Sequence, residues 1–129
     1  MEVLSSRILL QPSDFAAARR FYEDALGLRI YREYGIDGRV TGVVLFLGGG
    51  FLELTATAGP PSPVTLWLQV PDLGAEHERL AERDDVTITA PPRRKPWGLD
   101  EMWLAAPDGV QIVLVEVPEG HPIRSRVHG

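Results

Sequence analysis

The sequence predicts an α+β protein built from two βαβββ modules in tandem, with sheet as the dominant element. Three observations lead to this prediction. Segments of alternating hydrophobicity outnumber helical ones, each half of the chain holds a single amphipathic helix, and a ten-residue pattern recurs at a constant spacing. A stretch rich in proline and glycine at 58–63 separates the halves, because these residues interrupt strands and helices.

The length and composition limit what the protein can be. The 129 residues fit one domain, with modules at 5–57 and 64–118 and a polar tail at 119–129. A net charge of −5 is unfavourable for binding nucleic acid, and the lack of cysteine excludes disulfides and thiolate metal sites. No apolar run is long enough to cross a membrane, and residues 1–7 lack the pattern of a secretion signal, so we expect a cytoplasmic protein.

The repeat relates residues 8–17 to residues 66–75 at an offset of 58. In both copies a strand-like segment is followed by an aspartate placed to cap the first turn of a helix, Asp14 in one and Asp72 in the other. The positions identical in the two copies are Leu10/Leu68, Gln11/Gln69, Asp14/Asp72 and Ala17/Ala75. The shared order of strand and helix supports a true repeat.

In the first module we expect strands at 7–11, 28–34, 41–47 and 51–57. The helix begins after Asp14, ends at Gly27 and buries an apolar stripe. That stripe consists of Ala18, Phe21, Tyr22 and Ala25.

In the second module we expect strands at 65–70, 86–89, 101–105 and 110–117, with a turn at 107–109. The helix runs from Asp72 to about residue 83 and turns Leu73, His77, Leu80 and Ala81 toward the sheet. Residues 90–98 are expected to form a loop that carries the cations Arg93, Arg94 and Lys95, which either reach over a cavity mouth or are simply solvated.

Side chains alternate between the two faces of a strand, so residue parity sorts them into two sets. One set is wholly apolar and suits the face covered by the helices: Ile8, Leu10, Leu52, Leu54, Leu66, Leu68, Val70, Met102, Leu104, Ile112 and Leu114. The other set is mixed and includes Arg7, Glu53, Thr65, Trp67, Trp103, Gln111 and Val113. This second face is either a wetted surface or a binding pocket, and the two tryptophans favour the pocket.

Several motifs resemble those of the vicinal oxygen chelate superfamily, which includes glyoxalase I, extradiol dioxygenases, fosfomycin-resistance enzymes and bleomycin-resistance proteins. These motifs are the 14–28 run, Phe51-Leu52-Glu53-Leu54, Val70-Pro71-Asp72-Leu73, Pro96-Trp97-Gly98 and Pro107-Asp108-Gly109. The resemblance covers nearly the whole chain. It implies sheets that curl around a cavity, and a homodimer.

The resemblance also implies four positions where the enzymes of the family hold a metal ion. In this chain they are Arg7, Glu53, Thr65 and Val113, of which only Glu53 is a ligand of the family's type. A transition metal needs three or four nitrogen, oxygen or sulfur donors, valine supplies none, and a guanidinium repels the cation. We therefore expect no metal and no other cofactor.

These observations favour a metal-free protein, similar to the bleomycin-resistance branch, that sequesters a partly aromatic or polar small molecule. Arg7 and Glu53 either hold polar groups of that ligand or only neutralise each other. The expected ligand-binding residues are Arg7, Glu53, Thr65, Trp67, Trp97, Trp103 and Gln111, with the tryptophans stacking on a planar group.

Two enzymatic alternatives remain at this point. The first is a metal-dependent glyoxalase-like enzyme, lyase or dioxygenase that uses a divalent metal. The second is a metal-free enzyme in which Glu53 is the general base and Arg7 stabilises developing charge. The sequence identifies neither the ligand nor whether modules pair within one chain or are exchanged between chains.

Overall fold

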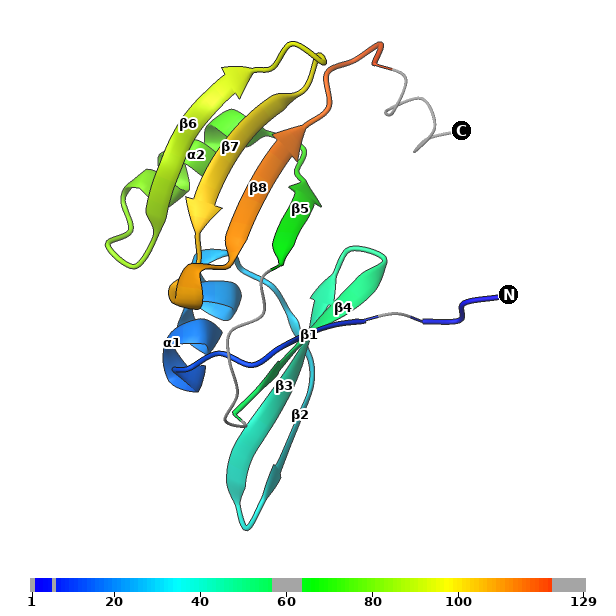
Figure 1. Ribbon diagram of the computed structural model, residues 1–129, viewed down its shortest axis with the longest axis vertical. Coiled ribbons are helices and arrows are strands. Elements are labelled where there is room, and N and C mark those ends of the chain that lie inside the picture. Colours follow the sequence, from blue (N-terminus) through cyan, green and yellow to red (C-terminus); the bar gives the residue numbers. More distant parts are fainter. Residues whose placement is uncertain (1, 6, 57–63, 122–129) are drawn as a thin grey trace. The chain divides into compact units, whose positions relative to one another are not determined.

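The computed structural model describes residues 2–5, 7–56 and 64–121 of the chain (Figure 1). The chain divides into two compact units. Unit 1 is Met1–Pro63 with Pro107–Gly109, and unit 2 is Val64–Ala106 with Val110–Gly129. The chain order of the elements is βαβββ twice, with a four-stranded mixed sheet in each repeat. This confirms the predicted fold class of two tandem βαβββ modules. The module bounds and the single-domain interpretation stay predictions.

Unit 1 has an open sheet in the order β1-β4-β3-β2, in which β1 and β4 are parallel and the other pairs are antiparallel. Its elements are β1 (Arg7–Leu10), α1 (Phe15–Arg19), η1 (Arg20–Ala25), β2 (Ile30–Ile36), β3 (Arg39–Leu47) and β4 (Gly50–Thr55). The parallel pairing of β1 with β4 requires a crossover, and the helix supplies it.

The helix of unit 1 begins as predicted and changes its hydrogen bonding midway. Asp14 caps it, because one of its carboxylate oxygens accepts from the Ala17 amide at 2.9 Å. From Arg20 to Ala25 the turns widen to π-helical geometry, which hydrophobic periodicity does not reveal. The predicted stripe of Ala18, Phe21, Tyr22 and Ala25 is buried, and Gly27 follows with the positive φ of 74° expected where a helix stops.

Unit 2 has the same arrangement, with the sheet order β5-β8-β7-β6 and a parallel pair of β5 and β8. Its strands and helix are β5 (Thr65–Gln69), α2 (Leu73–Ala81), β6 (Thr87–Arg94), β7 (Asp100–Ala105) and β8 (Gln111–Glu116). A 3-10 turn, η2 (Pro107–Gly109), joins β7 to β8. Helix α2 packs on one face of β6, β7 and β8 (Figure 1).

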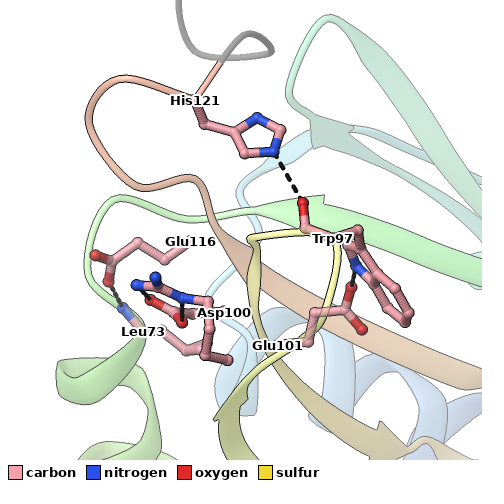
Figure 2. A network of polar contacts seen from close by, with 7 residues as sticks. Leu73, Trp97, Asp100, Glu101, Glu116 and His121 are labelled. Carbon is pink, nitrogen blue, oxygen red and sulfur yellow. Dashed lines mark hydrogen bonds and ion pairs between the residues drawn. The ribbon is translucent and has the colours of Figure 1, made fainter.

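Helix α2 is tied to the sheet at its first turn. Asp72 accepts from the Ala75 amide at 3.0 Å. The Glu116 side chain of β8 accepts from the Leu73 amide at 2.8 Å (Figure 2). These two carboxylates satisfy amides that have no partner inside the helix. Leu73 is buried as predicted, whereas Ala81 is exposed. Ala81 is the last residue of the helix, which was predicted to continue to about residue 83.

The segment 90–98, predicted as a loop, is a strand as far as Arg94. Strand β6 continues through Pro91 and Pro92 by two shifts in its pairing with β7, one between Ile88 and Ala90 and one between Ala90 and Arg93. Proline cannot donate to a ladder, but β6 is an edge strand, where a missing donor costs little. The prediction of a loop was wrong because two consecutive prolines indicate a loop in the local sequence, which does not show that the segment pairs with β7 at the edge of a sheet.

The helix-facing sides of both sheets form the apolar cores that parity predicts. The fully buried members include Leu10, Leu52, Leu54, Leu66, Met102, Leu104, Ile112 and Leu114, while Ile8, Leu68 and Val70 are half-buried. Burying each such side chain stabilises the fold by about 1.5–3 kcal/mol, which is enough to determine the strand register. Neither helix in the described ranges is both long enough and apolar enough to cross a membrane.

Candidate functional site

The open face of the unit 1 sheet, opposite its helix, carries a carboxylate between two donors. Arg7 of β1 donates through Nη1 to Glu53 Oε1 at 2.6 Å, and the Tyr34 hydroxyl of β2 donates to Glu53 Oε2 at 2.5 Å. The Glu53 side chain is only 14% exposed. Both carboxylate oxygens are therefore engaged, and we call these three residues the Glu53 triad.

Tyr34 reaches Glu53 by lying across the intervening strand β3. Tyr34 pairs with Gly42 in the β2–β3 ladder, and a Cβ atom added to Gly42 would lie 2.1 Å from Cζ of the tyrosine ring. Glycine leaves the space that the ring occupies. Tyr34 was not among the predicted site residues, although Gly42 inside the β-branched run of β3 is a signal that another group approaches the backbone there.

The contacts of the Glu53 triad decide its protonation. The hydrogen bond from Tyr34, followed by that from Arg7, holds the pKa of Glu53 below its ordinary value. Burial, followed by the hydrogen bond to Glu53, raises the pKa of Tyr34. At neutral pH the site thus contains an ionised carboxylate, a guanidinium and a neutral phenol.

Three aromatic rings lie next to the triad on the same face. The ring centroids are 4.9 Å apart for Tyr31 and Phe51, 5.2 Å for Tyr31 and Phe46, and 5.5 Å for Phe46 and Phe51. Tyr31 is 52% and Phe46 41% exposed. We call Tyr31, Phe46 and Phe51 the aromatic cluster, and its contact with the triad is Arg7, whose Cζ lies 5.8 Å from the Phe51 centroid.

A second guanidinium belongs to this face. Arg32 of β2 lies with its Cζ 5.5 Å from the Tyr34 centroid, and its positive charge contributes to the low pKa of Glu53. The β2–β3 pairing shifts between Ile30 and Arg32, which leaves Tyr31 outside the ladder and allows both Tyr31 and Arg32 onto one face. Strict alternation would have separated them, so the sequence pattern could not identify this pair.

The open face of the unit 2 sheet is apolar at its centre. Val113 of β8 pairs with Trp67 on one side and Trp103 on the other. Val113 is buried in a cluster with Leu99, Val115 and Val117, and Trp103 packs against this cluster. Trp67 is about half exposed, and the exposed Thr65 pairs with Gln111.

Trp97 is held in place beside this face by polar contacts. Its indole Nε1 donates to Glu101 Oε2 at 2.7 Å, and its carbonyl oxygen lies 3.1 Å from His121 Nε2 (Figure 2). Glu101 is only 7% exposed, while Trp97 itself is exposed. Glu101 is two residues from Trp103 on β7, so residue parity places it on the same face, but it was not among the predicted site residues.

Two of the three cations at 93–95 have separate partners. Arg94 pairs with Asp100 through two contacts of 2.5 and 3.1 Å, while Lys95 Nζ lies 5.9 Å from the Trp97 ring centroid. Strand geometry separates neighbouring side chains, because β6 extends to Arg94.

The structure thus brings Arg7 and Glu53 into direct contact in unit 1. In unit 2 it places Trp67 and Trp103 beside one valine and Thr65 beside Gln111. Trp97 is hydrogen-bonded to Glu101, near the start of β7. Five residues of these two faces were not among the predicted site residues: Tyr31, Arg32, Tyr34, Phe46 and Glu101.

The four positions at which the resemblance implies metal ligands do not fit a metal ion. Glu53 is engaged by a guanidinium and a phenol, and Val113 is packed among apolar side chains. Within residues 2–5, 7–56 and 64–121, no three acidic or histidine side chains form a group that could hold a metal. The donor set is therefore wrong in kind at Arg7 and Val113.

Several solved structures have a fold similar to that of this chain. TioX from Micromonospora sp. ML1 superposes with a TM-score of 0.75 at 18% identity, covering 90% of this chain and all (100%) of that one. A glyoxalase/bleomycin resistance protein/dioxygenase superfamily member from Sphaerobacter thermophilus DSM 20745 gives 0.70 at 26% identity, covering 89% and 98%. Lactoylglutathione lyase from Agrobacterium tumefaciens gives 0.66 at 19% identity, covering 90% and 94%.

A comparison with curated proteins finds no match. The family model described as Glyoxalase/Bleomycin resistance protein/Dioxygenase superfamily matches residues 5–114, which is most of the chain. This match agrees with the βαβββ repeat and with the strand orders of the two sheets. The chain belongs to the glyoxalase/bleomycin resistance protein/dioxygenase superfamily.

Proposed function

We propose that this protein is a metal-independent binding protein, similar to the bleomycin-resistance branch of its superfamily, that sequesters a small, partly aromatic or polar molecule on the open faces of its sheets. The observation that carries the proposal is the Glu53 triad, in which Arg7 and Tyr34 engage both oxygens of the one carboxylate at a family metal position. By family resemblance we further propose a homodimer, and from the sequence pattern we propose a cytoplasmic location.

The triad argues against a divalent metal at Glu53. A cation would have to displace both donors and would then face the positive guanidinium of Arg7. Displacement would leave the phenol and the guanidinium without their acceptor. These costs oppose metal binding and support a role for Glu53 in holding Arg7 and Tyr34 in position.

The triad also argues against Glu53 as a general base. A base needs a free lone pair and a pKa close to the working pH, and the pKa of Glu53 is lowered by its two donors. The open faces instead combine exposed aromatic rings with a few fixed polar groups, which is the composition of small-molecule binding sites. Binding without turnover is the function that this chemistry supports best.

The test is equilibrium dialysis of the purified protein against Zn²⁺, Mn²⁺ and Ni²⁺, followed by metal analysis. We expect no stoichiometric metal, and the same result for Glu53→Gln. The variant Arg7→His is the matched control, because it places a metal-ligand side chain at one of the family's metal positions. Its metal content shows whether Arg7 prevents metal binding. Stoichiometric metal in the wild-type protein that Glu53→Gln abolishes would overturn the proposal.

Turnover is checked separately by native mass spectrometry of the purified protein and of any small molecule that accompanies it. We expect that molecule to be released unchanged after incubation. A ligand that returns chemically altered with wild-type protein but unaltered with Glu53→Gln would make the protein an enzyme.

A further inference from the structure

We propose that the open face of the unit 1 sheet binds a planar aromatic molecule that carries an anionic group. The ring packs on the aromatic cluster of Tyr31, Phe46 and Phe51, and the anionic group is held by Arg32 together with Arg7. This inference rests on the proposed function and names the class of its ligand.

The ladder places the two parts of this site at the spacing of such a molecule. On β3, Phe46 pairs with Phe51 of β4. Two residues earlier on β3, Val44 pairs with Glu53 of β4 on one side and with Arg32 of β2 on the other. Residues two apart on a strand lie on the same face at a separation of about 7 Å. A fused pair of aromatic rings with one charged substituent spans that separation.

The charge on this face selects an anion over a cation. Arg7 is neutralised by Glu53, with which it makes an ion pair at 2.6 Å. Arg32 has no ion pair among the described residues, and its guanidinium lies over the Tyr34 ring, which in turn is held by Glu53. The face therefore carries one positive charge in excess, although the whole chain has a net charge of −5. Guanidinium groups bind carboxylates by charge-assisted hydrogen bonds.

The aromatic cluster supplies a surface for the ring of the ligand. Its three rings contact one another, so their orientations are constrained before a ligand arrives, yet Tyr31 and Phe46 keep about half of their surface exposed. Preorganised aromatic side chains lose little conformational freedom on binding.

The experiment compares three probes of the same ring system by isothermal titration calorimetry: 2-naphthoate, 2-naphthamide and 2-naphthylmethylammonium. We expect 2-naphthoate to bind about tenfold or more tightly than either of the others, since one charge-assisted contact is worth about that factor. Rising salt should weaken the binding of 2-naphthoate and leave that of 2-naphthamide unchanged.

Variants locate the site. Arg32→Gln should weaken 2-naphthoate about tenfold and change the affinity for 2-naphthamide less than about twofold, so the neutral probe also reports that the variant is folded. Arg20→Gln, at an exposed arginine where η1 begins, makes the same change in net charge and should leave both affinities within about twofold. Phe46→Leu should weaken all three probes.

Each remaining outcome overturns the inference, and the outcomes separate it from the proposed function. Equal or tighter binding of the neutral or cationic probe, weakened by Phe46→Leu, means that a small-molecule site exists but its ligand class is wrong. Failure of all three probes to bind, together with a dimer in sedimentation that Phe46→Glu dissociates, means that a second copy covers this face. Insensitivity of 2-naphthoate binding to Arg32→Gln means that the site lies elsewhere. Metal binding, in contrast, is decided by the dialysis experiment.

Discussion

The open faces of the two units differ at equivalent positions of the same ladder. In unit 1 the residue of β4 that pairs with Leu9 is Glu53, and in unit 2 the residue of β8 that pairs with Trp67 is Val113. Glu53 is held by two polar donors, whereas Val113 is buried in an apolar cluster against which Trp103 packs. One unit thus presents fixed charge and the other presents tryptophan surface.

The helix-facing sides do not differ in this way. Both are apolar and buried in the two units, and they determine which residues of each strand face the core. With the register set by that side, the open sides of the two sheets carry different residues on the same strand order. The comparison teaches that the repeat preserves the core and varies the open face, which is the face on which we propose that a ligand binds.

The largest expected effects concern the helix-facing cores, in which the two units are alike. Leu52 and Ile112 occupy equivalent ladder positions, and both are fully buried. Leu52→Ala and Ile112→Ala should each lower the free energy of unfolding by about 2–5 kcal/mol, because each leaves a cavity in its core. Urea denaturation followed by circular dichroism measures this.

The control for these truncations is Thr65→Ala, on the exposed open face, which should change the free energy of unfolding by less than about 0.5 kcal/mol. A loss below about 1 kcal/mol for either core variant would show that the two cores are not equivalent, and that the helix-facing side does not determine the register in that unit.

A smaller effect is expected where the open faces diverge. Gly42→Ala should lower the free energy of unfolding by about 1–3 kcal/mol, since the new Cβ overlaps the Tyr34 ring and drives it away from Glu53. Gly49→Ala is the matched control, because no atom lies within 4 Å of its added Cβ. Equal stabilities of the two variants would mean that Tyr34 does not cross β3 at Gly42.

The smallest effect is the pH dependence of the Glu53 triad. The lowered pKa of Glu53 means that its contribution to stability is present above its ordinary pKa of 4.5 and is lost as the pH falls through the lower, folded value. The difference in unfolding free energy between wild type and Glu53→Gln, about 1 kcal/mol or less for a partly exposed pair, should therefore shrink on acidification. Urea denaturation at a series of pH values between neutral and strongly acidic measures it.

Tyr34→Phe refines this measurement, because the Tyr34 hydrogen bond is the largest cause of the low pKa of Glu53. In that variant the contribution of Glu53 should begin to be lost at a higher pH than in wild type. A wild-type difference that stays constant down to strongly acidic pH would show that Glu53 is not engaged by its two donors in solution.

Much of the fold followed from local patterns. Alternation identified the buried side chains of the strands, and the apolar stripe with its aspartate cap located both helices. The errors lie where a neighbouring strand overrides a local signal. Pro91 and Pro92 indicate a loop, yet an edge strand tolerates them. Ala81 fits the helical stripe, but it is the last residue of the helix and is exposed.

The sequence by itself determined the repeat, the register of the cores and the mismatch at Arg7 and Val113 with metal binding, because side-chain type and spacing are sufficient for these conclusions. Only the tertiary structure decided what surrounds Glu53. Tyr34 lies 19 residues away along the chain, and its contact with Glu53 depends on the pairing of β2 with β3, on the pairing of β3 with β4 and on the space at Gly42. Such contacts arise from the packing of distant strands, and no local pattern encodes them.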